Sequence, residues 1–332
     1  MGLNITQLTG ESIQDIIAAL QALEPGLVTT TKAGKLAPNA ECIEDGFIKL
    51  ATSTNKGLMS KAFAELLENP EKLVFIGGKS LTQNAGFHNS IYRGKNLGNS
   101  VSADQWAAIS AGSFDDLFIG DYWQINSINW RIAAFDYWYN QGDTACATHH
   151  VVIVPDDNLL VADGSTTHWL HSSNTTEGGY VGTDFYAGTN SNTGKSQCRT
   201  KAQSAFGSGH ILTHREYLTN SCMSGANNVG YPTAGGWYDS DIEIMNERMV
   251  YGNAPFSPVS NGTNIPSNYT IDNAQLPLFA LDHKRICNRA NWWLRDPVSG
   301  ALFALVDSYG NCAYYSASGA GIGVRPAFGI RA

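Results

Sequence analysis

Charged residues are scarce in this sequence. Asp, Glu, Lys and Arg make up only 15% of the 332 residues, whereas about a quarter is usual. The net charge is −8, and no stripe or tail of Lys and Arg stands out. Nucleic acids bind to basic faces, and anionic lipid headgroups attract basic segments. We therefore expect neither nucleic acid nor a membrane as a partner.

Long apolar runs are also lacking. No stretch approaches the roughly 20 residues of a membrane span, and residues 1–5 show no basic segment leading into an apolar signal core. We therefore expect the chain to be made and folded in a cytosol. In that compartment, scattered cysteines without a Cys-x-x-Cys pair predict reduced, mostly buried thiols. They are Cys42, Cys146, Cys198, Cys222, Cys287 and Cys312.

Motifs for catalysis and metal binding are missing too. There is no Gly-x-Ser-x-Gly, no His-Glu-x-x-His and no phosphate-cradling loop. His149 and His150 are adjacent, so on a strand they would point to opposite faces and not share a metal. Asp239, Asp241 and Glu243 could offer oxygens to calcium, but acids at a helix N-terminus explain them better. The sequence predicts no catalytic residue, metal or cofactor.

The N-terminal part contains an amphipathic helix and short strands. One apolar stripe runs along residues 12–23, formed by Ile13, Ile16, Ile17, Leu20 and Leu23. A helix of this length is marginal alone, so its stripe must pack, either on its own domain or on another copy. Residues 28–60 predict Thr-rich strands, each too short to bury a core, and a second short helix follows around residues 63–67. Such segments order by pairing with neighbouring chains.

The segment Asn55–Ser60, with the order Asn-Lys-Gly-Leu-Met-Ser, resembles a segment of phage tail-fibre and head-fibre shafts. That resemblance implies intertwined trimers. We expect residues 1–73 to form a virion-attachment and trimerisation region that contacts other virion proteins. Residues 74–99, rich in Gly and Asn, predict a connector, and residues 100–332 predict one continuous domain.

The C-terminal part predicts a mixed α+β domain. A helix is expected over residues 104–109, ended by Gly112, and strands over residues 122–126, 129–139 and 150–155. Asn126 and Ser127 predict a hairpin turn. Ser240 and Glu243 form a capping-box pattern that predicts a helix continuing to Gly252. Short strands are expected over residues 292–330.

Several short segments, taken in their order along the sequence, resemble a protein family from phages and prophages of Gram-positive bacteria. They are Gly120–Trp123, Trp130–Ala133, His149–Asp156, Gly178–Gly182, Met245–Glu247, Trp293–Arg295 and Gly323–Phe328. The ending also resembles variable proteins of diversity-generating retroelements. That implies a C-type-lectin-like domain of short strands, two helices and long loops, whose tip binds a cell-surface ligand.

The core of this domain is expected to include apolar residues near the C-terminus. They are Trp293, Leu294, Phe303, Val306, Val324 and Phe328. Arg325, before Pro326, is expected to bond backbone carbonyls or an acidic partner rather than a ligand.

Residues 307–323 form the most informative loop. Tyr, Ser, Gly, Ala, Asn and Asp dominate it, and Lys, Glu, Gln, Met and Trp are missing. Antibody paratopes have this composition, and mutagenesis of adenines by a retroelement would leave the same residue types. Three interpretations remain open: an ordinary Gly/Ser-rich strand–turn–strand, a fixed binding loop, or a diversified one.

The leading hypothesis is therefore a non-enzymatic adhesion protein of a phage particle, assembled in the bacterial cytoplasm as a homotrimer. Its ligand would be a host cell-surface glycan or protein. The alternatives are a capsid decoration or head-fibre protein without an essential ligand, and a wall-polysaccharide depolymerase. The predicted ligand-binding residues share one solvent-facing tip: Asn291, Trp292, Asp307, Ser308, Tyr309, Asn311, Tyr314, Tyr315, Ser316 and Ser318.

Overall fold

A computed structural model describes residues 84–161, 170–188, 194–222, 232–256 and 272–332, and the backbone of four two-residue strands before them. The chain divides into two compact units, Met1–Leu81 and Thr82–Ala332. In the first unit, the short strands form two separate antiparallel pairs: β1 (Ile43–Glu44) with β2 (Phe47–Ile48), and β3 (Phe75–Ile76) with β4 (Lys79–Ser80). The predicted helices at residues 12–23 and 63–67 lie outside the described residues.

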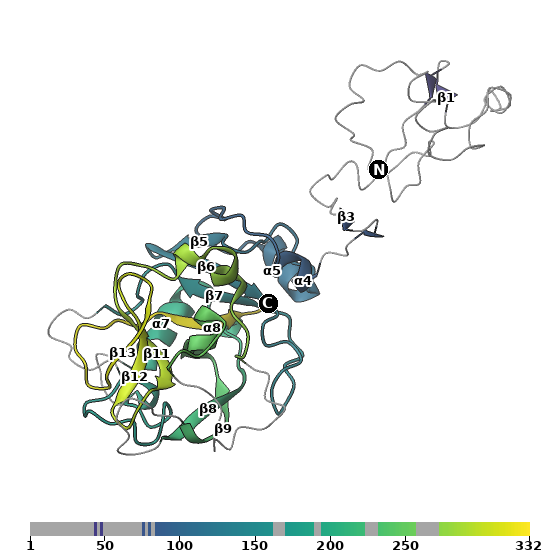
Figure 1. The fold of residues 1–332 in the computed structure, drawn as a ribbon. Coiled ribbons are helices and arrows are strands. Elements are labelled where there is room, and N and C mark those ends of the chain that lie inside the picture. The colour runs from purple at the N-terminus through teal and green to yellow at the C-terminus, as the bar shows by residue number, and fades with distance from the viewer. Residues whose placement is uncertain are drawn as a thin grey trace. The chain divides into compact units, whose positions relative to one another are not determined.

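An antiparallel sheet of five strands forms the centre of the second unit (Figure 1). Its order is β10-β14-β7-β6-β5, and every neighbouring pair is antiparallel. The strands are β5 (Tyr122–Ile125), β6 (Ile128–Phe135), β7 (Val151–Pro155), β10 (Ile242–Ile244) and β14 (Pro326–Ile330). All residues of β7, β10 and β14 are buried, because both faces of the sheet are covered. Antiparallel sheets combined with helices confirm the α+β class.

The hairpin between β5 and β6 follows from its turn. Asn126 and Ser127 both have positive φ, 53° and 61°. Positive φ at both central residues is the backbone of the two-residue turn that matches the twist of paired strands. The predicted hairpin is confirmed.

Helices cover the sheet and its ends. The expected helix near residue 104 is α5 (Ala103–Ala111), which Ser102 and Gln105 cap reciprocally and Gly112 ends with φ of 66°. The buried side of α7 (Lys195–Phe206) packs on the sheet, where the Phe206 ring lies 5.6 Å from that of Trp130. The other helices in the described ranges are α4 (Ala85–His88), α6 (Asp184–Ala187), α8 (Glu247–Tyr251) and α9 (Pro277–Leu281), with 3-10 turns at Ser208–His210 and His283–Arg285.

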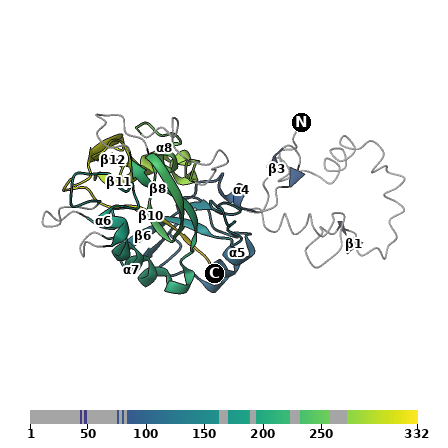
Figure 2. The same ribbon diagram turned by 90° about the horizontal axis from the view of Figure 1, so that it is seen from below.

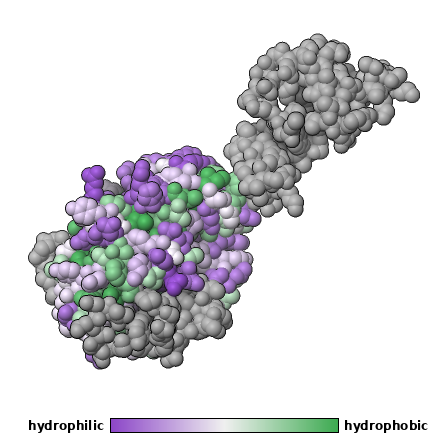
Figure 3. Space-filling model, in the orientation of Figure 1, coloured by the Kyte–Doolittle hydropathy of each residue, from purple (hydrophilic) through white to green (hydrophobic). Residues whose placement is uncertain are grey.

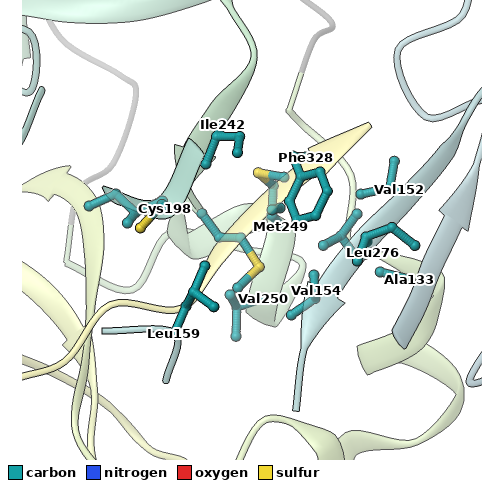
Figure 4. Close-up of a cluster of buried hydrophobic side chains, with 14 of the residues drawn as sticks. Ala133, Val152, Val154, Leu159, Cys198, Ile242, Met249, Val250, Leu276 and Phe328 are labelled. Carbon is teal, nitrogen blue, oxygen red and sulfur yellow. The ribbon is translucent and has the colours of Figure 1, made fainter. Parts of the chain in front are cut away.

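The core lies between the five-stranded sheet, α7 and α8. Figure 4 shows Phe328 of β14, Val152 of β7 and Met249 of α8 in one cluster of buried apolar side chains. All six predicted core residues are at most 1% exposed, which confirms that expectation. Arg325 is buried as well, and donates to the carbonyls of Pro155 and Arg285. It has the structural role that the sequence predicted.

Two smaller sheets complete the unit. A long ribbon pairs β8 (His214–Cys222) with β9 (Pro232–Ser240). A three-stranded antiparallel sheet has the order β11 (Trp292–Pro297), β12 (Leu302–Val306) and β13 (Cys312–Ser316). This sheet lies at the end of the unit away from α4 and α5 (Figure 1 and Figure 2).

The expected helix at residues 240–252 is wrong in its first half. Ser240 ends β9, and residues 242–244 form β10, where Ile242 pairs with Phe328. The helix α8 begins only at Glu247, with Asn246 as its N-cap, and Gly252 ends it as expected. Ser240 and Glu243 do contact, through a 2.9 Å hydrogen bond between their side chains. The contact is a tertiary one, because pairing with β14 outweighs the local helix signal.

The second unit begins earlier than residue 100. Residues 84–99, expected to be part of a connector, pack on this unit. Arg93 pairs with the buried Asp121, and the backbone N–H of Leu97 donates to the carbonyl of Tyr122. These bonds place the segment along the outer edge of β5.

Among the described residues, no helix combines the length and apolar character needed to cross a membrane. The surface in view mixes hydrophilic and hydrophobic residues (Figure 3). The five cysteines in the described ranges are all free thiols, as expected. Only Cys146 and Cys198 are buried, and the other three are half-buried.

Candidate ligand-binding surface

The loop between β12 and β13 is a tight turn organised by Asp307. One oxygen of its carboxylate accepts hydrogen bonds from the backbone N–H groups of Tyr309 and Asn311, and the other accepts from the Asn311 amide. The Asp307 N–H donates in turn to the Asn311 carbonyl. Asp307 was predicted to bind ligand, but these bonds give it the role of fixing the hairpin loop.

Three tyrosines of this hairpin are exposed. Tyr309 at the turn is 83% exposed, and Tyr314 and Tyr315 on β13 are 42% and 53% exposed. In the described part of the chain, only two other large apolar residues, Val161 and Leu281, are exposed. Exposed aromatic side chains are therefore concentrated on one hairpin.

The three tyrosines do not share one face, contrary to the sequence prediction. Tyr314 pairs with Ala304 and Tyr315 with Phe303, so they occupy opposite faces of the sheet. Neighbours along a strand always alternate in this way. Both rings are nevertheless accessible, because β13 is the edge strand of its sheet. The tyrosines therefore border the edge from two sides.

On each face of the sheet, the tyrosine ring packs against a neighbouring residue. The ring of Tyr314 meets that of Phe256 edge-on at 5.0 Å. The ring of Tyr315 lies against Gly319, where a Cβ atom would fall only 2.3 Å from the tyrosine Cδ1. These contacts hold the two rings in place while leaving much of each exposed. Nothing local in the sequence links Phe256 to residue 314, so this contact could not be predicted from the sequence.

Beneath Tyr314, two carboxylates lie close together. The buried Glu247 accepts hydrogen bonds from the Phe256 N–H and the Cys312 thiol, while its own N–H donates to Asp296. Burial and the charge of Glu247 raise the pKa of Asp296 to about 7. Burial and the same carboxylate raise the pKa of Cys312 far above its usual value, so this thiol stays protonated.

The prediction that Trp292 binds ligand at an exposed tip is wrong. Trp292 is fully buried, and the Arg325 guanidinium lies 5.3 Å from its ring centre. Asn291 is half-buried, and its carbonyl accepts hydrogen bonds from Gly323 and Asn158. The sequence could not separate Trp292 from a surface aromatic, because the segment that covers it is distant in the chain.

The remaining predicted residues lie on or beside the hairpin. Asn311 is exposed, and Ser308, Ser316 and Ser318 are half-buried. The Ser308 carbonyl accepts from the Cys287 thiol, and that of Ser316 accepts from Gly319. The structure thus brings together every predicted residue except Trp292 and Asn291 at the accessible hairpin.

The acidic residues considered for calcium each pair with a cation. Asp239 pairs with Arg215, Asp241 with Arg199, and Glu243 with Lys195. The interpretation as acids at a helix N-terminus is wrong, because Asp239 lies on β9 and Glu243 on β10. Across the described ranges, no three His, Cys, Asp or Glu side chains come together in a way that could hold a metal ion.

The adjacent histidines have different environments. His149 is partly exposed, and its Nδ1 lies 2.7 Å from Asp136. His150 is fully buried, and its Nε2 accepts a hydrogen bond from the Trp138 N–H. Burial lowers the pKa of His150 to about 4, so it is neutral at pH 7.

No protein-family model matches the chain, and searches of curated proteins and of solved structures found no significant similarity.

Proposed function

We propose that this chain is an adhesion protein of a bacteriophage particle, which binds a ligand on the surface of a Gram-positive host. The hairpin of β12 and β13 is the proposed binding tip, on a C-type-lectin-like scaffold. The observation that carries the proposal is the exposure of Tyr309, Tyr314 and Tyr315 on this hairpin, whereas Phe303 and Val306 beneath it are buried. Rigid, exposed tyrosines are the residues that supply contact area in binding loops.

In the same proposal, the N-terminal region forms a homotrimer and attaches it to the phage particle. The trimer is proposed from the sequence of residues 1–70, most of which lie outside the described residues. Light scattering on the full chain should give about three times 35.8 kDa. A folded monomer would contradict this part of the proposal.

The test of adhesion is binding of the purified chain to cells of the bacterium that the phage infects. A chain with both Tyr314→Ala and Tyr315→Ala should bind much more weakly, since a central interface aromatic often contributes about 2 kcal/mol or more. Leu281→Ala is the matched control, because Leu281 is 43% exposed but lies on α9. This control should bind like the unmodified chain.

Other outcomes identify the alternatives. If the double variant binds host cells as well as the unmodified chain, the tyrosines have no essential ligand, which favours a decoration protein. Release of reducing sugars from host wall would instead indicate a depolymerase.

Diversification of the loop is a further part of the proposal. Residues 307–323 include exposed positions such as Tyr309 and Asn311 and buried ones such as Ala317 and Ile322. Variation at the exposed positions would change the binding surface and spare the core. A reverse-transcriptase gene beside a near-copy of the codons for residues 287–328 would support it.

A further inference from the structure

In the described part of the chain, neighbouring segments cover two sheet edges, the outer edge of β5 and that of β11. Beside β5, Leu97 donates to the Tyr122 carbonyl, and Gln124 donates to that of Gly98. Beside β11, Trp293 donates to the Gly323 carbonyl. The fold thus satisfies these edges with its own backbone, as proteins usually do.

The outer edge of β13 differs. The Asp307 N–H donates to the Asn311 carbonyl, and the Ala317 N–H donates to that of Ala301. Since hydrogen-bonded and non-hydrogen-bonded pairs alternate in an antiparallel ladder, Ala313 and Tyr315 point their backbone groups toward β12. The N–H and C=O groups of Cys312, Tyr314 and Ser316 therefore point away from the sheet.

Within the described ranges, no backbone hydrogen bond reaches the outward groups of Cys312 or Tyr314. The outward carbonyl of Ser316 accepts from Gly319 in the following turn. The sequence of β13, Cys-Ala-Tyr-Tyr-Ser, has no proline and no charged residue. Those are the features that normally prevent an edge strand from pairing.

We propose that the ligand of this hairpin is an extended polypeptide segment, which adds to β13 as a fourth strand. This inference rests on the proposed adhesion function and specifies its partner. Outward N–H and C=O groups recur at every second residue, about 7 Å apart, which is the repeat of another extended backbone. A glycan chain has no main-chain N–H and C=O groups at this spacing to pair with them. Tyr314 and Tyr315, one on each face, would contact side chains of the added strand.

The decisive comparison is between Tyr314→Pro and Tyr314→Ala. Both remove the tyrosine ring, but only proline removes the outward N–H, which makes no bond within the sheet. Proline is tolerated on edge strands at such positions, so both variants should melt at similar temperatures. Ala313→Pro is the folding control: it removes an N–H that points toward Leu305, and it should lower the melting temperature strongly.

Binding of the full-length chains to host cells should then fall in two steps. Tyr314→Ala weakens binding, and Tyr314→Pro should weaken it by up to about tenfold more, the effect of one hydrogen bond. Exhaustive proteolysis of the intact host cells should abolish binding of the unmodified chain. This second measurement decides the question even if Tyr314→Pro does not fold.

The outcomes separate the two proposals. Equal binding by folded Pro and Ala variants, or binding that survives proteolysis and is competed by purified wall glycan, overturns the polypeptide ligand and leaves adhesion standing. If the unmodified chain does not bind intact host cells, adhesion itself is wrong, and this inference fails with it.

Discussion

Replacing Arg295 with methionine is expected to destabilise the second unit in a pH-dependent way. Arg295 on β11 is buried, and its guanidinium donates to Glu216 of β8 at 3.1 Å and to Asp272 at 2.6 Å. Both acids are almost completely buried. The Trp138 indole also donates to Asp272, at 2.7 Å. Arg295 thus provides positive charge to two carboxylates that lie away from water.

The expected loss is large at high pH. Removing one partner of a buried ion pair costs about 3–5 kcal/mol, because a charge remains uncompensated. Burial and the charge of Glu216 already raise the pKa of Asp272 to about 6, against an ordinary value of 3.8. A carboxyl group with a raised pKa stabilises the folded state fully below pH 3.8, and this stabilisation is lost as the pH rises through about 6. The free energy of unfolding lost in this way is about 3 kcal/mol. Without Arg295 this pKa should rise further, so the loss should continue to higher pH.

Urea unfolding of the full chain at pH 5.5 and pH 8 tests this. All eight tryptophans lie in the second unit, so their fluorescence reports on that unit alone. The control Arg215→Met removes partly exposed ion pairs with Asp143 and Asp239 from β8, the strand that carries Glu216. Solvent screens these pairs, so the control should change the midpoint little. Adding Glu216→Gln and Asp272→Asn to Arg295→Met should recover stability. The reasoning is refuted if Arg295→Met costs no more than the control, or equally at both pH values.

Three further predictions concern stability. Phe303→Ala should lower the free energy of unfolding by about 3–5 kcal/mol in the same assay, because the ring is fully buried. Tyr315→Ala, at the paired position on β13, should lower it far less. Similar losses would mean that Tyr315 belongs to the core. Burial lowers the pKa of His150 to about 4, so its contribution is present above pH 6.5 and is lost as pH falls toward 4. Between pH 6.5 and 4, the unmodified chain should lose about 3 kcal/mol more than His150→Asn, and parallel pH profiles would contradict this. A chelator should leave the melting temperature unchanged, since the described residues contain no group of metal ligands, and a large decrease would reveal a missed site.

Local signals in the sequence located several elements correctly. Asn126 and Ser127 tolerate the positive φ that their turn requires, so the β5–β6 hairpin could be predicted. Gly112 marks the end of α5 as predicted, while Ser102, which the prediction did not use, caps its start. These signals work because the interactions that form them span only a few residues.

The sequence indicated which segment forms the candidate site, but not which face of the sheet each of its side chains occupies. The Tyr-rich composition of residues 307–323 identified the exposed hairpin, yet it grouped Tyr314 and Tyr315 on one surface. The alternation of side chains along a strand would have separated them, once residues 312–316 were taken as a strand. By contrast, no local signal distinguishes the buried Trp292 from an exposed aromatic residue.

By itself, the sequence determined the α+β class, the turns and caps, and which residues near the C-terminus are apolar enough for a core. Only the tertiary structure decided that residues 242–244 pair with β14 instead of starting a helix. It also decided that β13 is an edge strand, and that Phe256 supports Tyr314. The physical reason is range: capping and turn preferences act between near neighbours, whereas strand pairing and burial depend on segments that meet only when the chain folds.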